Sequence, residues 1–202
     1  MKLKGKILLL VIAPIAVFCA VIYLVCSIRI STVVKEIIQN DLYAMTLAVE
    51  ESICRGLGYE DEYYVDENGD LWNSGELNLS KDMEGLDSIS KSAGIDITVF
   101  YGDTRKATTV LDASGQREID TKASQTVIDR VLKGGETYFA ENVDVQGQPY
   151  FAYYAPLYNS TDSSKPVGMI FAGMKQEKVE RDIAMILQFI AITGISLVVL
   201  CS

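Results

Sequence analysis

The sequence contains no histidine among its 202 residues. This absence excludes Ser-His-Asp and Cys-His nucleophilic sites, histidine metal ligands and a phospho-accepting histidine within this chain. Cysteine is also scarce, and three of the four cysteines, Cys19, Cys26 and Cys201, lie in long apolar runs. Cys54 cannot form an internal disulfide with them, so it is either a free thiol or pairs with Cys54 of a second copy. We expect no enzymatic activity, no metal and no other cofactor.

Two apolar runs without a charged residue flank the centre of the chain. They cover residues 7–28 and 183–202, with 22 and 20 residues. At ~1.5 Å per helical residue, each run spans about 30 Å, the thickness of the hydrocarbon core of a bilayer. The sequence therefore predicts transmembrane helices over 7–28 and 183–202, with one domain, residues 29–182, between them.

Charge is distributed unevenly along the chain, which has a net charge of −9. Lys2, Lys4 and Lys6 precede the first run, whereas all 27 acidic residues lie between the two runs. Because basic flanks stay in the cytoplasm, we expect residues 1–6 inside and residues 29–182 outside, in a multi-pass protein of the plasma membrane. A cleaved signal peptide is the alternative, but the run is longer than usual and no A-x-A-like site follows it. The acidic domain also argues against nucleic acid as a partner.

An apolar stripe continues beyond the first run. Its members are Val34, Ile38, Leu42, Met45, Val49 and Ile53, at spacings of three or four residues. This period predicts a helix that leaves the membrane unbroken and ends near Gly56 and Gly58. The stripe can cover a sheet, contact the same helix of a second copy, or do both in turn. We expect it to pack on a sheet, and we expect a homodimer through this helix with contacts at positions such as Ile38 and Met45.

The remainder of the domain has the pattern of strands and turns. Strands are predicted over 63–66, 70–72, 95–101, 108–111, 137–145, 149–158 and 167–173, and short helices over 83–92 and 124–132. Asn68-Gly69 marks a hairpin turn because it supplies positive φ, and Gln146-Gly147 separates a second hairpin. Turn chemistry also accounts for Asp66 and Asp70, whose spacing does not fit an EF-hand calcium loop. The fold class is α+β, an antiparallel sheet of five to six strands packed on the long N-terminal helix.

Four segments together resemble the single Cache domain, a PAS-like extracellular sensor of bacterial chemoreceptors and related membrane receptors. They are residues 96–105 (DITVFYGDTR), 121–124 (TKAS), 150–157 (YFAYYAPL) and 167–173 (VGMIFAG). The chain departs from the family at Asp120, where the family has a glycine before the Thr-Lys pair. The resemblance implies that the long helix packs on one face of the sheet and that the other face holds a small ligand.

The resemblance further implies the ligand-sensing region of a transmembrane methyl-accepting chemotaxis receptor. Such receptors continue after their second span, so we expect a cytoplasmic signalling module in the same chain beyond Ser202. Ligand binding is expected to displace the helices that enter the membrane. The alternatives are the sensor region of a membrane histidine kinase or cyclic-nucleotide enzyme, and a membrane-anchored extracellular binding or adhesion module.

Arg105 is the first candidate for contact with a ligand, because a guanidinium is a fork of donors suited to a carboxylate. In the related citrate- and C4-dicarboxylate-sensing domains, an arginine followed three residues later by a polar residue contacts the ligand, and Arg105 and Thr108 match that spacing. The alternative is a surface pairing of Arg105 with Asp103 or with a backbone carbonyl. The further candidates for ligand contact are Tyr101, Thr104, Lys122, Tyr150 and Tyr154.

The charge of the expected ligand follows from the strand over 149–158. Alternation places Tyr150, Ala152 and Tyr154 on one face and Phe151, Tyr153 and Ala155 on the other. The related dicarboxylate sensors carry basic residues where this chain has Ala152 and Tyr154. We therefore expect a smaller or singly charged organic ligand, with a monocarboxylate as the candidate, or a neutral ligand held by hydroxyl groups.

Overall fold

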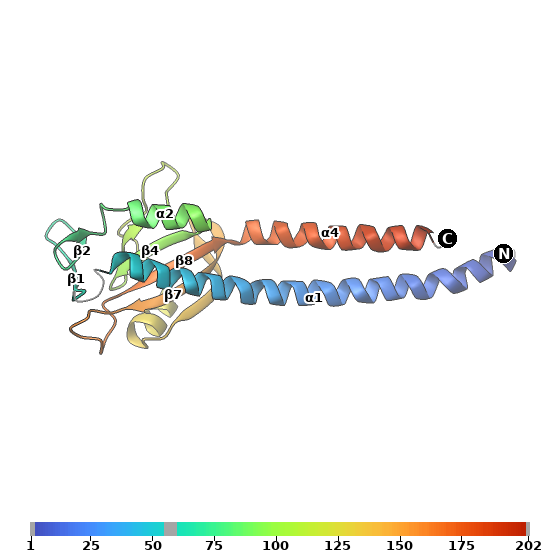
Figure 1. The fold of residues 1–202 in the computed structure, drawn as a ribbon, viewed down its shortest axis with the longest axis horizontal. Coiled ribbons are helices and arrows are strands. Elements are labelled where there is room, and N and C mark those ends of the chain that lie inside the picture. The colour runs from blue at the N-terminus through green and yellow to red at the C-terminus, as the bar shows by residue number, and fades with distance from the viewer. Residues whose placement is uncertain (1–2, 55–59, 201–202) are drawn as a thin grey trace. The chain divides into compact units, whose positions relative to one another are not determined.

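The computed structural model describes residues 3–54 and 60–200, without the side chains of residues 3–9, 11, 197, 198 and 200. The chain divides into two compact units. Ile38–Gln176 forms the sheet-bearing unit, and the helical segments before and after it form the other. Helix α1 (Leu3–Ile53) runs through the first segment into the sheet-bearing unit, and helix α4 (Gln176–Leu200) follows that unit (Figure 1).

The long N-terminal helix is continuous across the end of the first apolar run, as predicted. Its segment Ile12–Ile53 is long and apolar enough to cross a membrane, with a mean hydropathy of 2.2 in its most apolar window. The predicted helix end near Gly56 and Gly58 falls on residues 55–59, which lie outside the described residues. Helix α4 covers the described part of the second apolar run. The crossing of a membrane by α4, and the boundaries 7–28 and 183–202, stay predictions.

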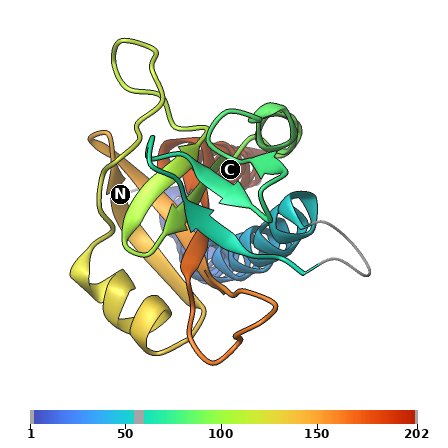
Figure 2. The same cartoon turned by 90° about the vertical axis from the view of Figure 1, so that its left-hand side faces the viewer.

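A five-stranded antiparallel sheet forms the centre of the sheet-bearing unit (Figure 2). Its strands are β4 (Asp96–Tyr101), β5 (Thr104–Thr108), β6 (Tyr138–Val145), β7 (Gln148–Leu157) and β8 (Gly168–Lys175). The order across the sheet is β5-β4-β8-β7-β6. Hairpins therefore join β4 to β5 and β6 to β7, and β8 is inserted between the two hairpins. This arrangement confirms the predicted α+β, PAS-like class.

The turn between β6 and β7 has the backbone conformation of a two-residue hairpin. Gln146 and Gly147, between β6 and β7, have φ values of 54° and 73°, as a two-residue turn with the twist of a hairpin requires. The strand predicted over 108–111 instead occupies Thr104–Thr108. It begins earlier because the chain turns at Gly102, where φ is 54°. It ends earlier because the chain after Thr108 leaves the sheet in a loop.

The last four turns of α1 pack on one face of this sheet. Ile38, Leu42, Val49 and Ile53 are all buried, with exposed fractions of 0 to 4%. The ring of Tyr43 lies 5.5 Å from the ring of Tyr153 in β7, centroid to centroid. Four of the six residues of the predicted stripe therefore form the surface of α1 that covers the sheet, whereas Met45 is half-buried and Val34 lies outside the sheet-bearing unit.

Short helical segments cover the opposite face. They are α3 (Gln125–Val127) and η1 (Ile128–Lys133), and η1 contacts β7 and β8. A helix was predicted over 124–132, but from Ile128 onward its turns are π-helical, with Gly134 N donating to Asp129 O at 3.1 Å. Helix α2 (Glu84–Ala93) confirms the predicted short helix and ends at Gly94, where φ is 66°.

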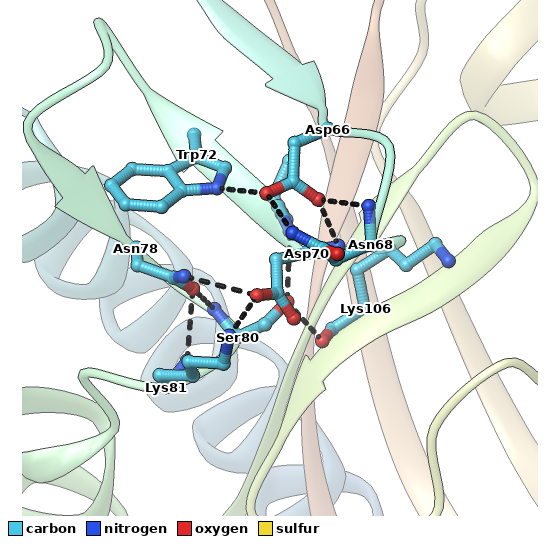
Figure 3. Close-up of polar contacts among 9 residues, drawn as sticks. Asp66, Asn68, Asp70, Trp72, Asn78, Ser80, Lys81 and Lys106 are labelled. Carbon is cyan, nitrogen blue, oxygen red and sulfur yellow. Dashed lines mark hydrogen bonds and ion pairs between the residues drawn. The ribbon is translucent and has the colours of Figure 1, made fainter.

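A small second sheet precedes α2 and contains β1 (Tyr63–Val65), β2 (Leu71–Asn73) and β3 (Leu77–Asn78). The turn between β1 and β2 is built around Asp66 (Figure 3). Its carboxylate accepts hydrogen bonds from the backbone N–H groups of Asn68 and Asp70, both at 2.9 Å, and from Trp72 Nε1 at 3.0 Å. Lys81 and Asn78 donate to the carboxylate of Asp70. These carboxylates stabilise the hairpin, as turn chemistry predicts.

Candidate ligand-binding site

The site lies on the sheet face opposite α1, which we call the η1 face after the segment that covers it. Its buried side chains are Phe100, Val110, Val127, Val131, Val145, Tyr150, Ala152, Tyr154, Met169 and Phe171. Residues paired directly across strands share a face, and the register pairs Tyr154 with Phe171 and Ala152 with Gly173. Tyr153, between them, contacts α1. The predicted alternation along β7 is therefore confirmed.

A β-bulge directs Arg105 to the η1 face. Val99 pairs with Ala107, but Phe100 pairs with Arg105, so Lys106 is an extra residue in β5. Residues three apart in a regular strand point to opposite faces. The bulge changes this relation and places Arg105 on the same face as Thr108, which pairs with Thr98. The two residues that the sequence linked by their spacing are brought together on one face through this irregularity.

The guanidinium of Arg105 is largely buried and only partly paired. Its side chain is 12% exposed, and its Cζ lies 5.7 Å from the centroid of the Phe100 ring. Nη1 donates to the carboxylate of Glu118, and also to the Glu118 carbonyl at 3.4 Å. Nε is buried and has no hydrogen-bond partner among the described residues. An unpaired buried donor costs about 1–3 kcal/mol, so a ligand oxygen that reached this N–H would recover that cost.

Glu118 is the partner that the sequence did not identify. The expected alternative was Asp103 or a backbone carbonyl: Asp103 instead pairs with Lys122 at 2.8 Å, whereas the carbonyl of Glu118 does accept from Arg105. Glu118 lies 13 residues after Arg105 in a loop, where neither periodicity nor a motif indicates the pairing. The loop returns along β5, with Arg105 N donating to Thr121 O at 2.9 Å and Asp120 N donating to Arg105 O at 2.8 Å. These backbone bonds hold Glu118 beside the guanidinium.

Tyr154 supplies a neutral hydroxyl next to this cation. Its ring packs against Phe171 at 5.3 Å and Tyr138 at 6.4 Å. Burial raises the pKa of Tyr154 to about 12, and the nearby charge of Arg105 opposes that rise. The hydroxyl is therefore protonated at neutral pH, and no described residue forms a hydrogen bond with it. Arg105 Nε and Tyr154 Oη are two donors on one face that a carboxylate could engage.

Thr108 and Tyr150 lie on the same face, but their hydroxyl groups are engaged within the protein. Thr108 Oγ1 lies 2.7 Å from Thr98 Oγ1 and accepts a hydrogen bond from Val110 N at 3.1 Å. Tyr150 Oη donates to Asp96 Oδ2 at 2.6 Å. Burial, and then this hydrogen bond, raise the pKa of Tyr150. Both residues help to shape the face, and a ligand would have to compete for their hydroxyls.

Among the described residues, none of the other three candidates forms a hydrogen bond with Arg105. The register places Tyr101 opposite Thr104 and Gly168, on the face that α1 covers. Thr104 Oγ1 donates to Asp103 Oδ1 at 2.8 Å. Lys122 is exposed, and its ion pair with Asp103 is the main cause that lowers the pKa of that carboxyl. Contact of these three residues with a ligand stays a prediction.

The centre of the η1 face is apolar. Phe171 and Met169 are almost completely buried there. A Cβ added at Gly173 would lie 2.3 Å from Phe171 Cζ, so the Phe171 ring occupies the space above this glycine. Ala152, the register partner of Gly173, is also fully buried. Two described arginines border this apolar centre. Arg105 is largely buried, whereas Arg130 is exposed and its Cζ lies 4.7 Å from the centroid of the Tyr138 ring.

The family assignment agrees with this architecture. A family model described as single Cache domain 3 matches residues 77–186, more than half of the chain. The chain therefore belongs to the single Cache domain family, a family of extracellular sensor domains. No curated protein matches the chain.

Proposed function

We propose that this chain is the sensor region of a transmembrane chemoreceptor that binds a small organic monocarboxylate outside the cell. Membership of the Cache family and the apolar segment Ile12–Ile53 support a membrane-anchored sensor. The observation that carries the ligand assignment is Arg105, a largely buried guanidinium whose Nε lacks a partner among the described residues.

The composition of the η1 face supports a ligand with one carboxylate and a small apolar body. Arg105 Nε and Tyr154 Oη offer hydrogen bonds to the carboxylate. Phe100 and Phe171 offer apolar contact. Ala152 and Tyr154 are neutral, so Arg105 is the largely buried cation among the described residues of this face, and a second carboxylate would have no buried counter-ion there.

Direct connection of the sheet to α4 supports the proposed transmission step. β8 ends at Lys175 and α4 begins at Gln176, so no flexible linker separates them. Phe171, on β8, packs against Tyr154. A ligand that binds one position of β8 more tightly than another would displace α4, and a cytoplasmic signalling module of the same protein would receive that displacement.

A homodimer through α1 is part of the same proposal. Ile38 is buried against the sheet, so it is not available for contact with a second copy. The large exposed apolar residues of α1 in the sheet-bearing unit are Tyr43 and Leu47, at 44 and 46% exposure. Because the ring of Tyr43 lies against Tyr153 of the sheet, we place the dimer contact on the side of α1 that carries Leu47.

Ligand binding to the full chain in lipid nanodiscs tests the ligand assignment. A panel of monocarboxylates, dicarboxylates, amino acids and amines is titrated by calorimetry. A monocarboxylate is expected to bind, and Arg105→Ala is expected to weaken it by about 1.5–3 kcal/mol, the range for a charge-assisted hydrogen bond.

Lys106→Gln is the matched control, because Lys106 is the next residue in β5 and pairs with Asp120. This variant is expected to bind as the wild type does. Equal affinity of Arg105→Ala and wild type for the same monocarboxylate would contradict the site, and no binding across the panel would contradict the ligand class.

A further inference from the structure

Glu118 occupies one side of the guanidinium on which the proposed function rests. Its carboxylate and its carbonyl oxygen both accept from Nη1 of Arg105. The opposite side, with Nε, has no partner among the described residues. A planar guanidinium can pair with one carboxylate through Nη1 and with a second through the edge that contains Nε.

The backbone holds Glu118 in this place. Arg117, the preceding residue, donates to both carboxylate oxygens of Asp87 in α2, at 3.0 and 2.6 Å, and to Thr108 O at 2.7 Å. Glu118 N donates to Val110 O at 3.0 Å. The carboxylate of Glu118 is therefore part of the folded site and not a side chain from a free loop.

The pair gives the site a net charge near zero before any ligand binds. Arg105 and Glu118 have side chains only 12 and 24% exposed, so solvent screens their charges incompletely. A ligand carboxylate on the Nε edge is attracted by Arg105 and repelled by Glu118. A ligand with two carboxylates meets that repulsion twice.

We propose that Glu118 is a specificity-determining residue that limits the ligand to a single negative charge. This role of Glu118 rests on the ligand assignment above, and Glu118 does not itself hold the ligand. Glu118 weakens the binding of every carboxylate at Arg105, and it weakens a dicarboxylate more than a monocarboxylate.

The test compares propionate, with one carboxylate, and succinate, with two, on the full chain in nanodiscs. Glu118→Gln keeps the size of the side chain and an oxygen that accepts from Nη1, but removes the charge. Propionate is expected to bind about 3- to 30-fold more tightly to Glu118→Gln than to wild type. The affinity for succinate is expected to increase by a larger factor, so that the ratio of the propionate affinity to the succinate affinity becomes smaller.

Asp120→Asn is the matched control, because it removes a neighbouring carboxylate of the same loop whose partner is Lys106. It is expected to leave both affinities unchanged. Circular dichroism verifies folding, and Glu118→Ala replaces Glu118→Gln if the latter does not fold.

Three results would overturn the inference while leaving the ligand assignment in place. In the first, the Glu118 variant binds propionate more weakly than wild type does. In the second, the variant and wild type bind both acids equally well. In the third, the affinities for the two acids increase by the same factor. Weaker binding of propionate would indicate that Glu118 positions the guanidinium of Arg105 for the ligand and does not oppose the charge of the ligand. If neither acid binds wild type or variant, the assignment of carboxylates to Arg105 fails, and the role of Glu118 fails with it.

Discussion

At the scale of single residues, Arg105 is a cation whose hydrogen-bond donors are only partly paired in the folded protein. Its identity as a candidate follows from side-chain chemistry alone, so the sequence could predict it. Its pairing with Glu118 could not be predicted, because a loop without periodicity brings the two residues together. Thr108 shows the opposite case. Its position near Arg105 was predicted, but its hydroxyl forms a hydrogen bond with the hydroxyl of Thr98 within the sheet.

Asp120 takes a glycine-like conformation at the position where the family has glycine. Its φ is 61°, and its carboxylate pairs with Lys106 at 2.7 Å. Asp120→Ala and Asp120→Gly both remove this pair, but only alanine keeps a Cβ that is strained at positive φ. We expect Asp120→Ala to be about 1 kcal/mol less stable than Asp120→Gly, measured by thermal unfolding of the full chain. Equal stability of the two variants would show that the left-handed conformation is not strained.

Cys54 is expected to be a slow nucleophile. Its Sγ lies 3.9 Å from Tyr63 Oη, and burial raises its pKa to about 11. With Cys19, Cys26 and Cys201 replaced by serine, iodoacetamide at pH 8 should alkylate the folded chain at least ~10-fold more slowly than the unfolded chain, whose thiol has a pKa of about 8.5. Equal rates would contradict the burial of this thiol.

At the scale of secondary-structure elements, local signals predicted the hairpins and the helix stripe. Gly69 and Gly147 set their turns through their preference for positive φ, and the period of α1 reflects the sheet it covers. The bulge at Lys106 could not be predicted, since it exists only in the pairing of β5 with β4. The π-helical turns of η1 were missed for a related reason: their apolar residues have the spacing of an ordinary helix.

The exposed side of α1 is where the dimer is expected to form. In a chain without native cysteines, Leu47→Cys in membranes should crosslink to its copy, because Leu47 is 46% exposed and apolar. Val49→Cys is the control, since Val49 is fully buried against the sheet and should not react. Crosslinking at an exposed position of the edge strand β6, such as Asn142→Cys, in place of Leu47→Cys would contradict the α1 interface.

At the scale of the whole molecule, the sheet-bearing unit is joined to the apolar helical segments on both sides. Residues 77–186 belong to a family of extracellular sensors, and the segment Ile12–Ile53 has the length and hydropathy of a membrane span. The length and hydropathy of the first apolar run were sufficient to predict the membrane-compatible segment of α1, and the sensor class followed from the resemblance of four segments.

The most direct test of the sensor function joins residues 1–202 to the cytoplasmic signalling module of a chemoreceptor and records its output in living cells. The input is the monocarboxylate that binds the chain most tightly, added outside the cell. The wild-type chimera should respond, Arg105→Ala should shift the midpoint of the response at least ~10-fold to higher concentration, and Lys106→Gln should not shift it. Identical midpoints for wild type and Arg105→Ala would contradict sensing through Arg105.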